Sequence, residues 1–256
     1  RRFVQQRLIP SFMEPRSVVV EPHGDGILMH SSTQVPHILR TMLGLTLGIP
    51  EHKVRVIAPD VGGGFGGKIP VTPEEVITTL VARELGKPAK YTESRSESIM
   101  SAHHGRGQIQ DVTITAKRDG TVTGLDVHLF ADMGAYLRLV GPGVPILGAF
   151  MYNAIYKIPA YRFVCEGIFT TKTPTDAYRG AGRPEASFVV ERLMETAARQ
   201  LKVDPTELRR KNFITQFPHQ TPVIMAYDIG DFNASLDAAM KSIDYAGFTA
   251  RKAKAK

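Results

Sequence analysis

The glycine-rich stretch PDVGGGFGGKIP, residues 59–70, decides how this chain is organised. Five glycines surround Phe65 within six positions. Glycine has no Cβ, so such a run lets backbone N–H groups approach a ligand closely and adopt positive φ angles. Phe65 adds a flat aromatic wall for a substrate or for packing. A tight crossover loop in which two backbones touch is the structural alternative.

Two nucleotide-binding interpretations of the same stretch are weak. In a dinucleotide-binding fold the GxGxxG loop runs directly into a helix, whereas Ile69-Pro70-Val71 separates the last glycine from a helix cap expected at Thr72. The acidic residue that should follow ~20 positions later is represented only by Glu93. A P-loop needs Ser or Thr after its lysine, where Ile69 stands. A nucleotide-binding module therefore stays only as an alternative.

Composition predicts an ordinary globular protein. The 256 residues are 43% hydrophobic and 22% charged, and no run approaches the ~18 apolar residues of a membrane span. The net charge of +7 is scattered among acids except in the final RKAKAK. No nucleic-acid-binding motif accompanies it, so we expect neither nucleic acid nor a membrane as partner. The single cysteine, Cys165, excludes an internal disulfide and an iron–sulfur cluster of this chain's own, and it fits the cytoplasm.

The two ends of the sequence indicate a piece of a longer chain. Residue 1 is Arg, and the last residues end in the middle of a charged pattern. The opening RRFVQQRLIP has no apolar run behind its arginines, so we expect no signal peptide.

Helices and strands are mixed without strict alternation, which predicts an α+β fold. Strands are expected at 18–22, 26–32, 53–58, 90–93 and 161–170, and in a hairpin around Asp119-Gly120. Helices are expected at 34–47, 73–85, 184–201, 205–212 and 232–243.

Several local signals refine this pattern. Thr33 is expected to cap the first helix and Gly48 to end it, and Thr72-x-x-Glu75 forms a capping box. In the long helix after Pro184, Phe188 is expected on the apolar face with Val189, Leu193, Ala197 and Leu201. The residues before the first strand are expected to be irregular.

A second stretch, TDAYRGAGRPEASFVVERL at 175–193, has a similar design. Arg179 and Arg183 flank Gly180-Ala181-Gly182, and Pro184 begins a helix. A helix N-terminus with small residues and arginines favours an anion site. Salt-bridged arginines around a simple turn are the alternative, and the residues alone do not decide between the two.

Five motifs in order resemble one enzyme family. They are SSTQVPH (31–37), VGGGFGGK (61–68), AHHGRG (102–107), DMGAY (132–136) and AYRGAGRPE (177–185). Together they resemble the molybdenum-binding large subunit of the xanthine dehydrogenase/aldehyde oxidase family, most of all its carbon monoxide dehydrogenase large-chain branch with AYRGAGR. The resemblance covers essentially the whole chain. It implies a first molybdopterin-binding domain at 1–256 with subdomains 1–100 and 101–256, and a second molybdenum-binding domain downstream.

The resemblance implies roles for particular residues. Gly64, Phe65 and Gly66 would present backbone amides to the molybdenum–pterin centre, and Phe65 would also wall the substrate site. Gln34 matches a glutamine that hydrogen-bonds an oxygen of that centre; a helix cap is its structural alternative. Arg179 matches an arginine that steadies developing negative charge beside the substrate.

The same resemblance assigns the second loop and the histidines. Backbone amides of Gly180, Ala181 and Gly182 would help to hold the centre. His103 and His104 could ligate a metal on chemistry alone. In the family they are loop residues, so the molybdenum is expected to be held by the pterin and by no side chain.

Two departures narrow the expected chemistry. Purine-oxidising members carry Glu after GGK, whereas Ile69 stands here, so we expect no purine specificity. True carbon monoxide dehydrogenases carry AYRCSFR, whose cysteine binds copper. Gly180 occupies that position, so no molybdenum–copper centre is expected.

The resemblance thus implies a molybdenum-dependent oxidoreductase. It would hydroxylate an aldehyde or an N-heterocyclic or aromatic carbon with water as the oxygen source, with a general-base glutamate in the downstream domain. The cofactor is expected in its cytosine dinucleotide form. Electrons would pass to a small subunit with 2Fe-2S clusters and a medium subunit with FAD, in a dimer of heterotrimers. An aerobic carbon monoxide dehydrogenase is the alternative enzyme.

Overall fold

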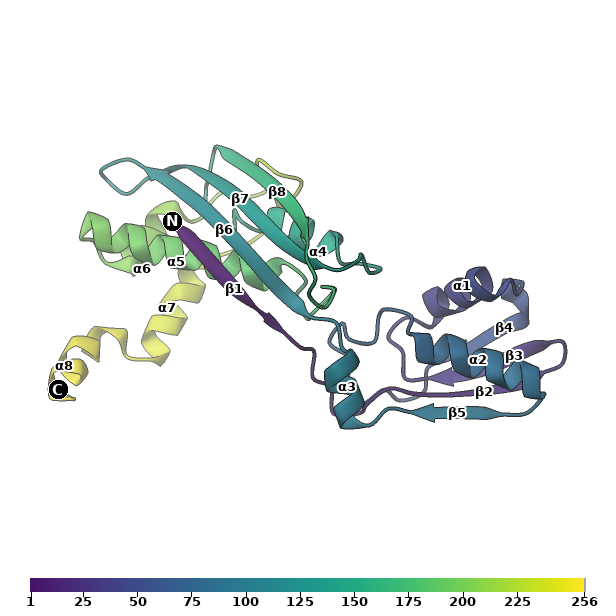
Figure 1. Ribbon diagram of the computed structural model, residues 1–256. Helices are drawn as coiled ribbons and strands as arrows, with labels where there is room; N and C mark the ends of the chain where they lie inside the picture. The colour runs from purple at the N-terminus through teal and green to yellow at the C-terminus, as the bar shows by residue number, and fades with distance from the viewer. Residues whose placement is uncertain (256) are drawn as a thin grey trace.

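Two four-stranded β-sheets, each covered by helices on one face, form most of the chain (Figure 1). The computed structural model describes residues 1–255. One sheet has the strand order β4-β3-β2-β5 and the other β1-β6-β7-β8. Each covers a separate hydrophobic cluster. This mixture of parallel and antiparallel strands with packed helices confirms the predicted α+β class.

The first sheet is built around a hairpin. Its strands are β2 (Ser17–His23), β3 (Gly26–Ser31), β4 (Val54–Ile57) and β5 (Ala89–Thr92). β4 runs parallel to β3, and the other pairs are antiparallel. Helices α1 (Pro36–Leu47) and α2 (Pro73–Leu85) bury Leu39, Leu43 and Ala82 against Val20 and Met29. The glycine-rich stretch connects β4 to α2, so both of its ends are fixed by this layer.

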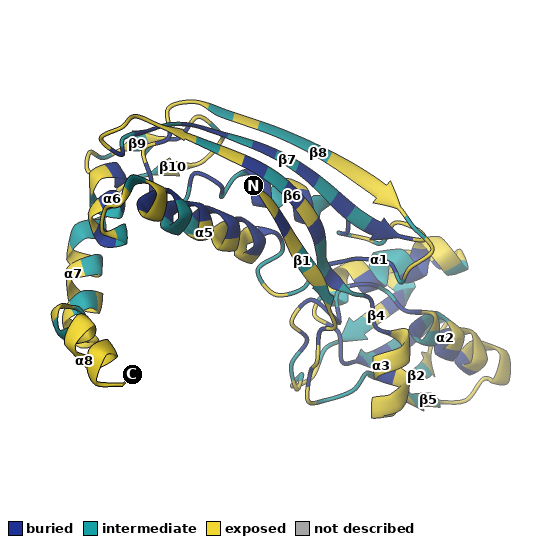
Figure 2. Cartoon of the chain, turned by 60° about the vertical axis from the view of Figure 1, so that its left-hand side comes forward, coloured by how far each residue is buried: buried dark blue, intermediate teal, exposed yellow. Residues whose placement is uncertain are grey.

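The second sheet is longer and twisted (Figure 2). Its strands are β1 (Arg2–Leu8), β6 (Gly105–Ala116), β7 (Val122–Gly134) and β8 (Tyr161–Phe169). β6 and β7 form the hairpin predicted at Asp119-Gly120, and β8 pairs parallel with β7. Helices α4 (Gly143–Ala149), α5 (Arg183–Leu201) and α6 (Pro205–Asn212) belong to this unit. Val189, Leu193 and Met194 of α5 pack onto Val127 and Leu129 of β7.

Some local predictions were wrong. Thr33 does not cap α1: the N-cap is Val35 with no side-chain bond, and Thr33 Oγ1 accepts from the Val35 amide just before the helix. Phe188 lies on the exposed side of α5, 47% exposed, with its ring edge against Phe3. The neighbouring Val190 is buried in its place.

Several elements had not been predicted. The opening expected to be irregular is β1, which pairs antiparallel with β6 at the sheet edge. Its alternating residues bury only Phe3, so its apolar signal is weak. Helix α3 (Arg95–Ser101) begins with a Ser94–Glu97 capping box but carries no apolar stripe. The short pair β9 (His219–Gln220) and β10 (Ala226–Tyr227) and helix α8 (Phe248–Lys254) were also missed.

The C-terminal helices extend away from the second sheet (Figure 1). Helix α7 (Phe232–Ser242) contacts the core through Phe232 and Leu236, and neither α7 nor α8 contains a buried residue. Within residues 1–255, no helix is both long and apolar enough to cross a membrane.

Candidate cofactor site

Gln34 anchors the glycine-rich stretch to the start of α1. Its side-chain Oε1 accepts from the amides of Gly66 at 2.9 Å and Lys68 at 3.2 Å. A Cβ on Gly64 would lie 2.4 Å from the same oxygen, so a larger residue there would displace the Gln34 side chain. Gln34 is exposed and precedes the N-cap of α1. The alternative of a helix cap is therefore wrong.

The glycine-rich stretch is also contacted by Phe12, Glu14 and Arg16, to which the sequence analysis gave no role. The Phe12 ring is 1% exposed and lies beneath Gly67, where a Cβ would approach it to 2.5 Å. Arg16 Nη2 donates to the Gly67 carbonyl at 2.7 Å. Glu14 accepts from the Gly62 amide and from Lys68 Nζ, both at 2.7 Å. Their only sequence signal was the irregular FMEPR segment before β2.

The two glycine-containing loops meet at Phe65. The Arg179 amide donates to the Phe65 carbonyl at 2.9 Å. Gly66, at φ +95°, lies so close to the second loop that a Cβ would be 2.3 Å from the Ala177 carbonyl oxygen. The Arg179 guanidinium carbon lies 5.9 Å from the Phe65 ring centroid, within cation–π range. The structure thus brings Gln34, Phe65 and Arg179 together.

The second loop has three successive residues with positive φ. Gly180, Ala181 and Gly182 have φ of +97°, +42° and +89°. A Cβ on Gly182 would lie 2.1 Å from the Val144 carbonyl oxygen, so the loop is pressed against α4. The Arg183 side chain donates back to the Gly180 carbonyl at 3.3 Å. Neither Arg179 nor Arg183 forms a salt bridge within the described chain, so the salt-bridge alternative fails there.

Several hydrogen-bond donors on these loops are free. Within residues 1–255, the donors without an acceptor include the Gln34 side-chain amide, the Arg179 guanidinium and the backbone amides of Gly64, Phe65, Gly180 and Gly182. The Gly66 amide differs, because it already donates to Gln34. The Ala181 amide likewise donates to the Tyr178 carbonyl. Clustered donors of this kind match an anionic cofactor, so the residues fit a phosphorylated pterin.

The two histidines of the AHHGRG motif face the protein. His103 is 1% exposed, and its Nε2 lies 2.9 Å from the Ala177 carbonyl oxygen. His104 Nδ1 lies 3.3 Å from Arg7 Nη1. Burial lowers the pKa of His103 to about 4, although the bond to Ala177 acts in the opposite direction. Across the part of the chain that the structure describes, no group of three metal-ligating side chains is present.

His103 should make the protein less stable in mild acid. Folded His103 takes up a proton near pH 4 and unfolded His103 near 6.5. Between these values the unfolded state binds more protons, so stability falls as pH falls. The loss by pH 4 is at most about 3 kcal/mol. Urea unfolding at pH 7 and pH 5 should show a smaller pH dependence for His103→Gln than for the parent; equal dependence would contradict the assignment.

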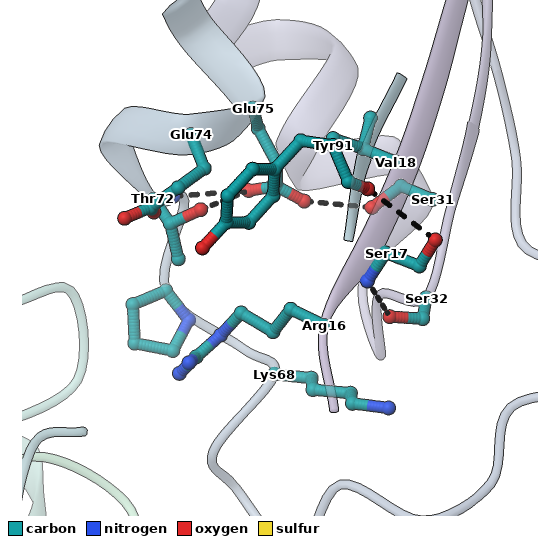
Figure 3. Close-up of a pocket in the computed structure, with 11 residues that line it drawn as sticks. Arg16, Ser17, Val18, Ser31, Ser32, Lys68, Thr72, Glu74, Glu75 and Tyr91 are labelled. Atoms are coloured by element: carbon teal, nitrogen blue, oxygen red, sulfur yellow. Dashed lines mark hydrogen bonds between the residues drawn. The ribbon is translucent and has the colours of Figure 1, made fainter. Parts of the chain in front are cut away.

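A small cavity lies between Lys68, near the end of the glycine-rich stretch, and residues of the first sheet and of α2, among them Ser31 and Glu75 (Figure 3). Its volume is about 10 Å³, which is near the minimum for one water molecule. Glu75 accepts there from Ser31 Oγ at 2.8 Å and from the Thr72 amide at 2.9 Å, and burial raises the pKa of its carboxyl. A larger hollow of about 520 Å³ near His219 is lined by neither loop. Neither Phe65 nor Arg179 lines either space.

Comparisons with known proteins identify the family. A family model described as the molybdopterin cofactor-binding domain matches residues 1–213. The chain belongs to this family, found in molybdenum-binding large subunits of the xanthine dehydrogenase type. The predicted membership is confirmed, and it favours a molybdopterin cofactor over the alternative of a nucleotide-binding module.

Individual relatives agree with this assignment. The chain is 35% identical over 235 residues to the nicotine 6-hydroxylase large subunit of Paenarthrobacter nicotinovorans, covering 91% of this chain and 29% of that protein. It is 35% identical over 238 residues to the carbon monoxide dehydrogenase large chain of Hydrogenophaga pseudoflava, covering 91% and 30%. Quinoline 2-oxidoreductase from Pseudomonas putida 86 superposes with a TM-score of 0.93 at 31% identity, covering 100% of this chain and 33% of that one. The chain thus spans less than a third of the curated relatives described here.

Proposed function

We propose that this chain forms one side of the molybdenum cofactor site in an enzyme that hydroxylates an aldehyde or an N-heterocyclic or aromatic carbon, with water as the oxygen source. One observation carries the proposal. The bond from the Arg179 amide to the Phe65 carbonyl joins the two glycine-containing loops. It leaves the Arg179 guanidinium within cation–π range of the exposed Phe65 ring, while the exposed Gln34 side chain accepts from the backbone of the same stretch.

Each residue has a role that follows from its free atoms. The bound cofactor supplies the two-electron redox centre. Gln34 fixes the loop through Oε1, and its Nε2 would donate to an oxygen of the cofactor. The free amides of Gly64, Phe65, Gly180 and Gly182 would help to hold the cofactor. The Phe65 ring forms a flat wall for the substrate, and Arg179 stabilises negative charge that develops on it.

The surroundings of Arg179 favour an organic substrate. The segment 135–144 contacts the second loop, since Cβ atoms on Gly141 and Gly182 would lie 2.6 Å from the Thr175 carbonyl and 2.1 Å from the Val144 carbonyl. This segment exposes the apolar side chains of Tyr136, Leu137 and Leu139, which are 59%, 53% and 45% exposed. An exposed apolar segment that contacts the arginine's loop suits a carbon skeleton with one polarised group.

Gly180 argues against the alternative of carbon monoxide oxidation at a molybdenum–copper centre. Its φ is +97°, and a Cβ there would lie 2.3 Å from Pro184 Cγ. The backbone therefore has no room for the cysteine that the copper-containing motif carries at this position. The free thiol of Cys165 lies on β8, in the second sheet.

The wider assembly belongs to the same proposal. The names of two relatives, a large subunit and a large chain, support the presence of partner subunits. We assign to those partners the 2Fe-2S clusters and FAD, in a cytoplasmic dimer of heterotrimers, with the pterin in its cytosine dinucleotide form. The division of this domain into subdomains 1–100 and 101–256 is part of the proposal, with β1 adding residues 2–8 to the second sheet.

Elemental analysis tests the proposal directly. The full-length large subunit, purified with its partner subunits, should contain about one molybdenum and no stoichiometric copper, because one cofactor cradle and no copper-binding thiol are available. Inductively coupled plasma mass spectrometry measures both metals. Stoichiometric copper would instead support the alternative function, carbon monoxide oxidation. The absence of molybdenum from a correctly assembled complex would contradict the proposed function.

A further inference from the structure

His103 is a buried polar residue that the proposed chemistry leaves without a role. Its ring is 1% exposed, and the hydrogen bond to the Ala177 carbonyl is its one polar contact, because Nδ1 has no partner among residues 1–255. Burying an imidazole with one unpaired nitrogen costs free energy that an apolar side chain of similar size avoids. We therefore expect the position of the Ala177 carbonyl to depend on this hydrogen bond.

The acceptor of that bond is the point where the two loops touch. The Ala177 carbonyl oxygen lies between the His103 ring and the α-carbon of Gly66, where a Cβ would approach it to 2.3 Å. Two residues later the Arg179 amide donates to the Phe65 carbonyl. The Ala177 carbonyl thus fixes the spacing between the loops directly before the arginine.

Residues 174–176, just before Ala177, are held by contacts that do not involve the His103 ring. The backbones of residues 104 and 174–176 pair side by side: the His104 amide donates to Pro174, and the Asp176 amide donates to His104. These bonds end at Asp176. From Ala177 to Arg179, the chain is held by the His103 bond, the approach to Gly66 and the bond to Phe65. The Arg106 guanidinium also donates to the Tyr178 and Arg179 carbonyls, at 3.4 and 2.9 Å, so His103 is the side chain that acts on the Ala177 carbonyl itself.

We propose that His103 is a positioning residue for Arg179, acting through the Ala177 carbonyl. The Nε2–H of the neutral imidazole holds this carbonyl against Gly66 and so keeps the Arg179 guanidinium beside the Phe65 ring. The catalytic part of this inference rests on the proposed function of Arg179. The geometric part does not, because it concerns only contacts within the chain.

A matched pair of substitutions isolates the hydrogen bond. His103→Gln and His103→Met place side chains of similar length in the same space, but only glutamine retains a donor at the position of Nε2. Both are made in the full-length subunit assembled with its partners. Amide hydrogen exchange in a peptide covering residues 177–182 measures the loop without any reaction. Aldehyde or heterocycle turnover and molybdenum content are measured on the same samples.

His103→Met should speed exchange of the 177–182 peptide about tenfold and lower kcat/KM by roughly 100-fold, with molybdenum retained. His103→Gln should restore most of both. Combining His103→Met with Arg179→Ala should cost no more turnover than Arg179→Ala alone, because the histidine acts through the arginine. Equal exchange and turnover in the Gln and Met variants would overturn the inference, as would a fully additive double variant.

The outcomes also separate this inference from the proposed function. Faster exchange in His103→Met together with unchanged turnover in Arg179→Ala would support the positioning of the loop and remove the catalytic role of Arg179. If His103→Met does not assemble, His103→Asn takes its place, because asparagine is too short to reach the Ala177 carbonyl while keeping the site polar. Parent-like exchange in His103→Asn would then count against the inference.

Discussion

Gly66→Ala should abolish cofactor binding. At φ +95° an L side chain is strained by about 1–3 kcal/mol. The new Cβ would lie 2.3 Å from the Ala177 carbonyl oxygen, which is backbone and cannot rotate away. Overpacking adds about 1–3 kcal/mol. The loops would move apart, and the bond from the Arg179 amide to Phe65 would be lost. Purified variant complex should therefore contain little molybdenum and show no turnover.

Gly143→Ala is the matched control for this substitution. Gly143 begins α4, and a Cβ there would meet nothing within 4 Å. Alanine also favours a helix over glycine by about 0.8–1 kcal/mol. The control should retain its molybdenum and unfold at or slightly above the parent temperature. Near-normal molybdenum in Gly66→Ala, measured beside this control, would show that the loop contact is not needed to hold the cofactor.

The parts of the fold that the sequence predicted depend on neighbouring residues. Gly48 ends α1 in the left-handed conformation, and the Thr72–Glu75 capping box begins α2. Asp119-Gly120 closes the β6–β7 hairpin as expected. Each of these signals acts over a few residues and has one favourable conformation. Local chemistry alone was enough to place them.

The parts that escaped prediction depend on contacts between distant segments. β1 is a strand because β6, whose paired residues lie 97 to 109 positions later, offers it an edge, while its own residues are mostly polar. The His103–Ala177 bond joins residues 74 positions apart. Gln34 could be assigned only through the family resemblance, and its actual bonds are to amides 32 and 34 positions away. No periodicity or capping rule contains such pairings.

The family resemblance identified the candidate residues, but the role of each depends on contacts between distant segments, which only the structure shows. Gly66 was expected to offer its amide to the cofactor, and it donates to Gln34 instead. Its glycine identity serves a different need, the close approach to Ala177. Free donors remain on Gly64, Phe65, Gly180 and Gly182 within the described chain. The candidate site therefore includes backbone donors whose loops are held in place by side-chain contacts such as that of Gln34.

Arg179→Ala should lower turnover by about 10²–10³-fold, the usual cost of removing one group that stabilises transition-state charge. It should leave folding almost unchanged, within about 0.5 kcal/mol, because the guanidinium has no hydrogen bond or ion pair elsewhere in residues 1–255. Molybdenum content should also be retained. Arg179→Lys keeps the charge but loses the planar group that faces the Phe65 ring, so it should recover only part of the rate.

The measurements are steady-state kinetics with an aldehyde or N-heterocycle, urea unfolding and metal analysis. Arg192→Ala is the control, since Arg192 is an exposed arginine further along α5, and it should behave as the parent. If Arg179 acts electrostatically, Arg179→Ala should lower kcat more than it raises KM for an uncharged substrate, because charge develops only as the reaction proceeds. A loss confined to KM would mean that Arg179 binds the substrate without assisting its reaction, and parent-like kinetics in a molybdenum-loaded variant would place the reacting carbon elsewhere.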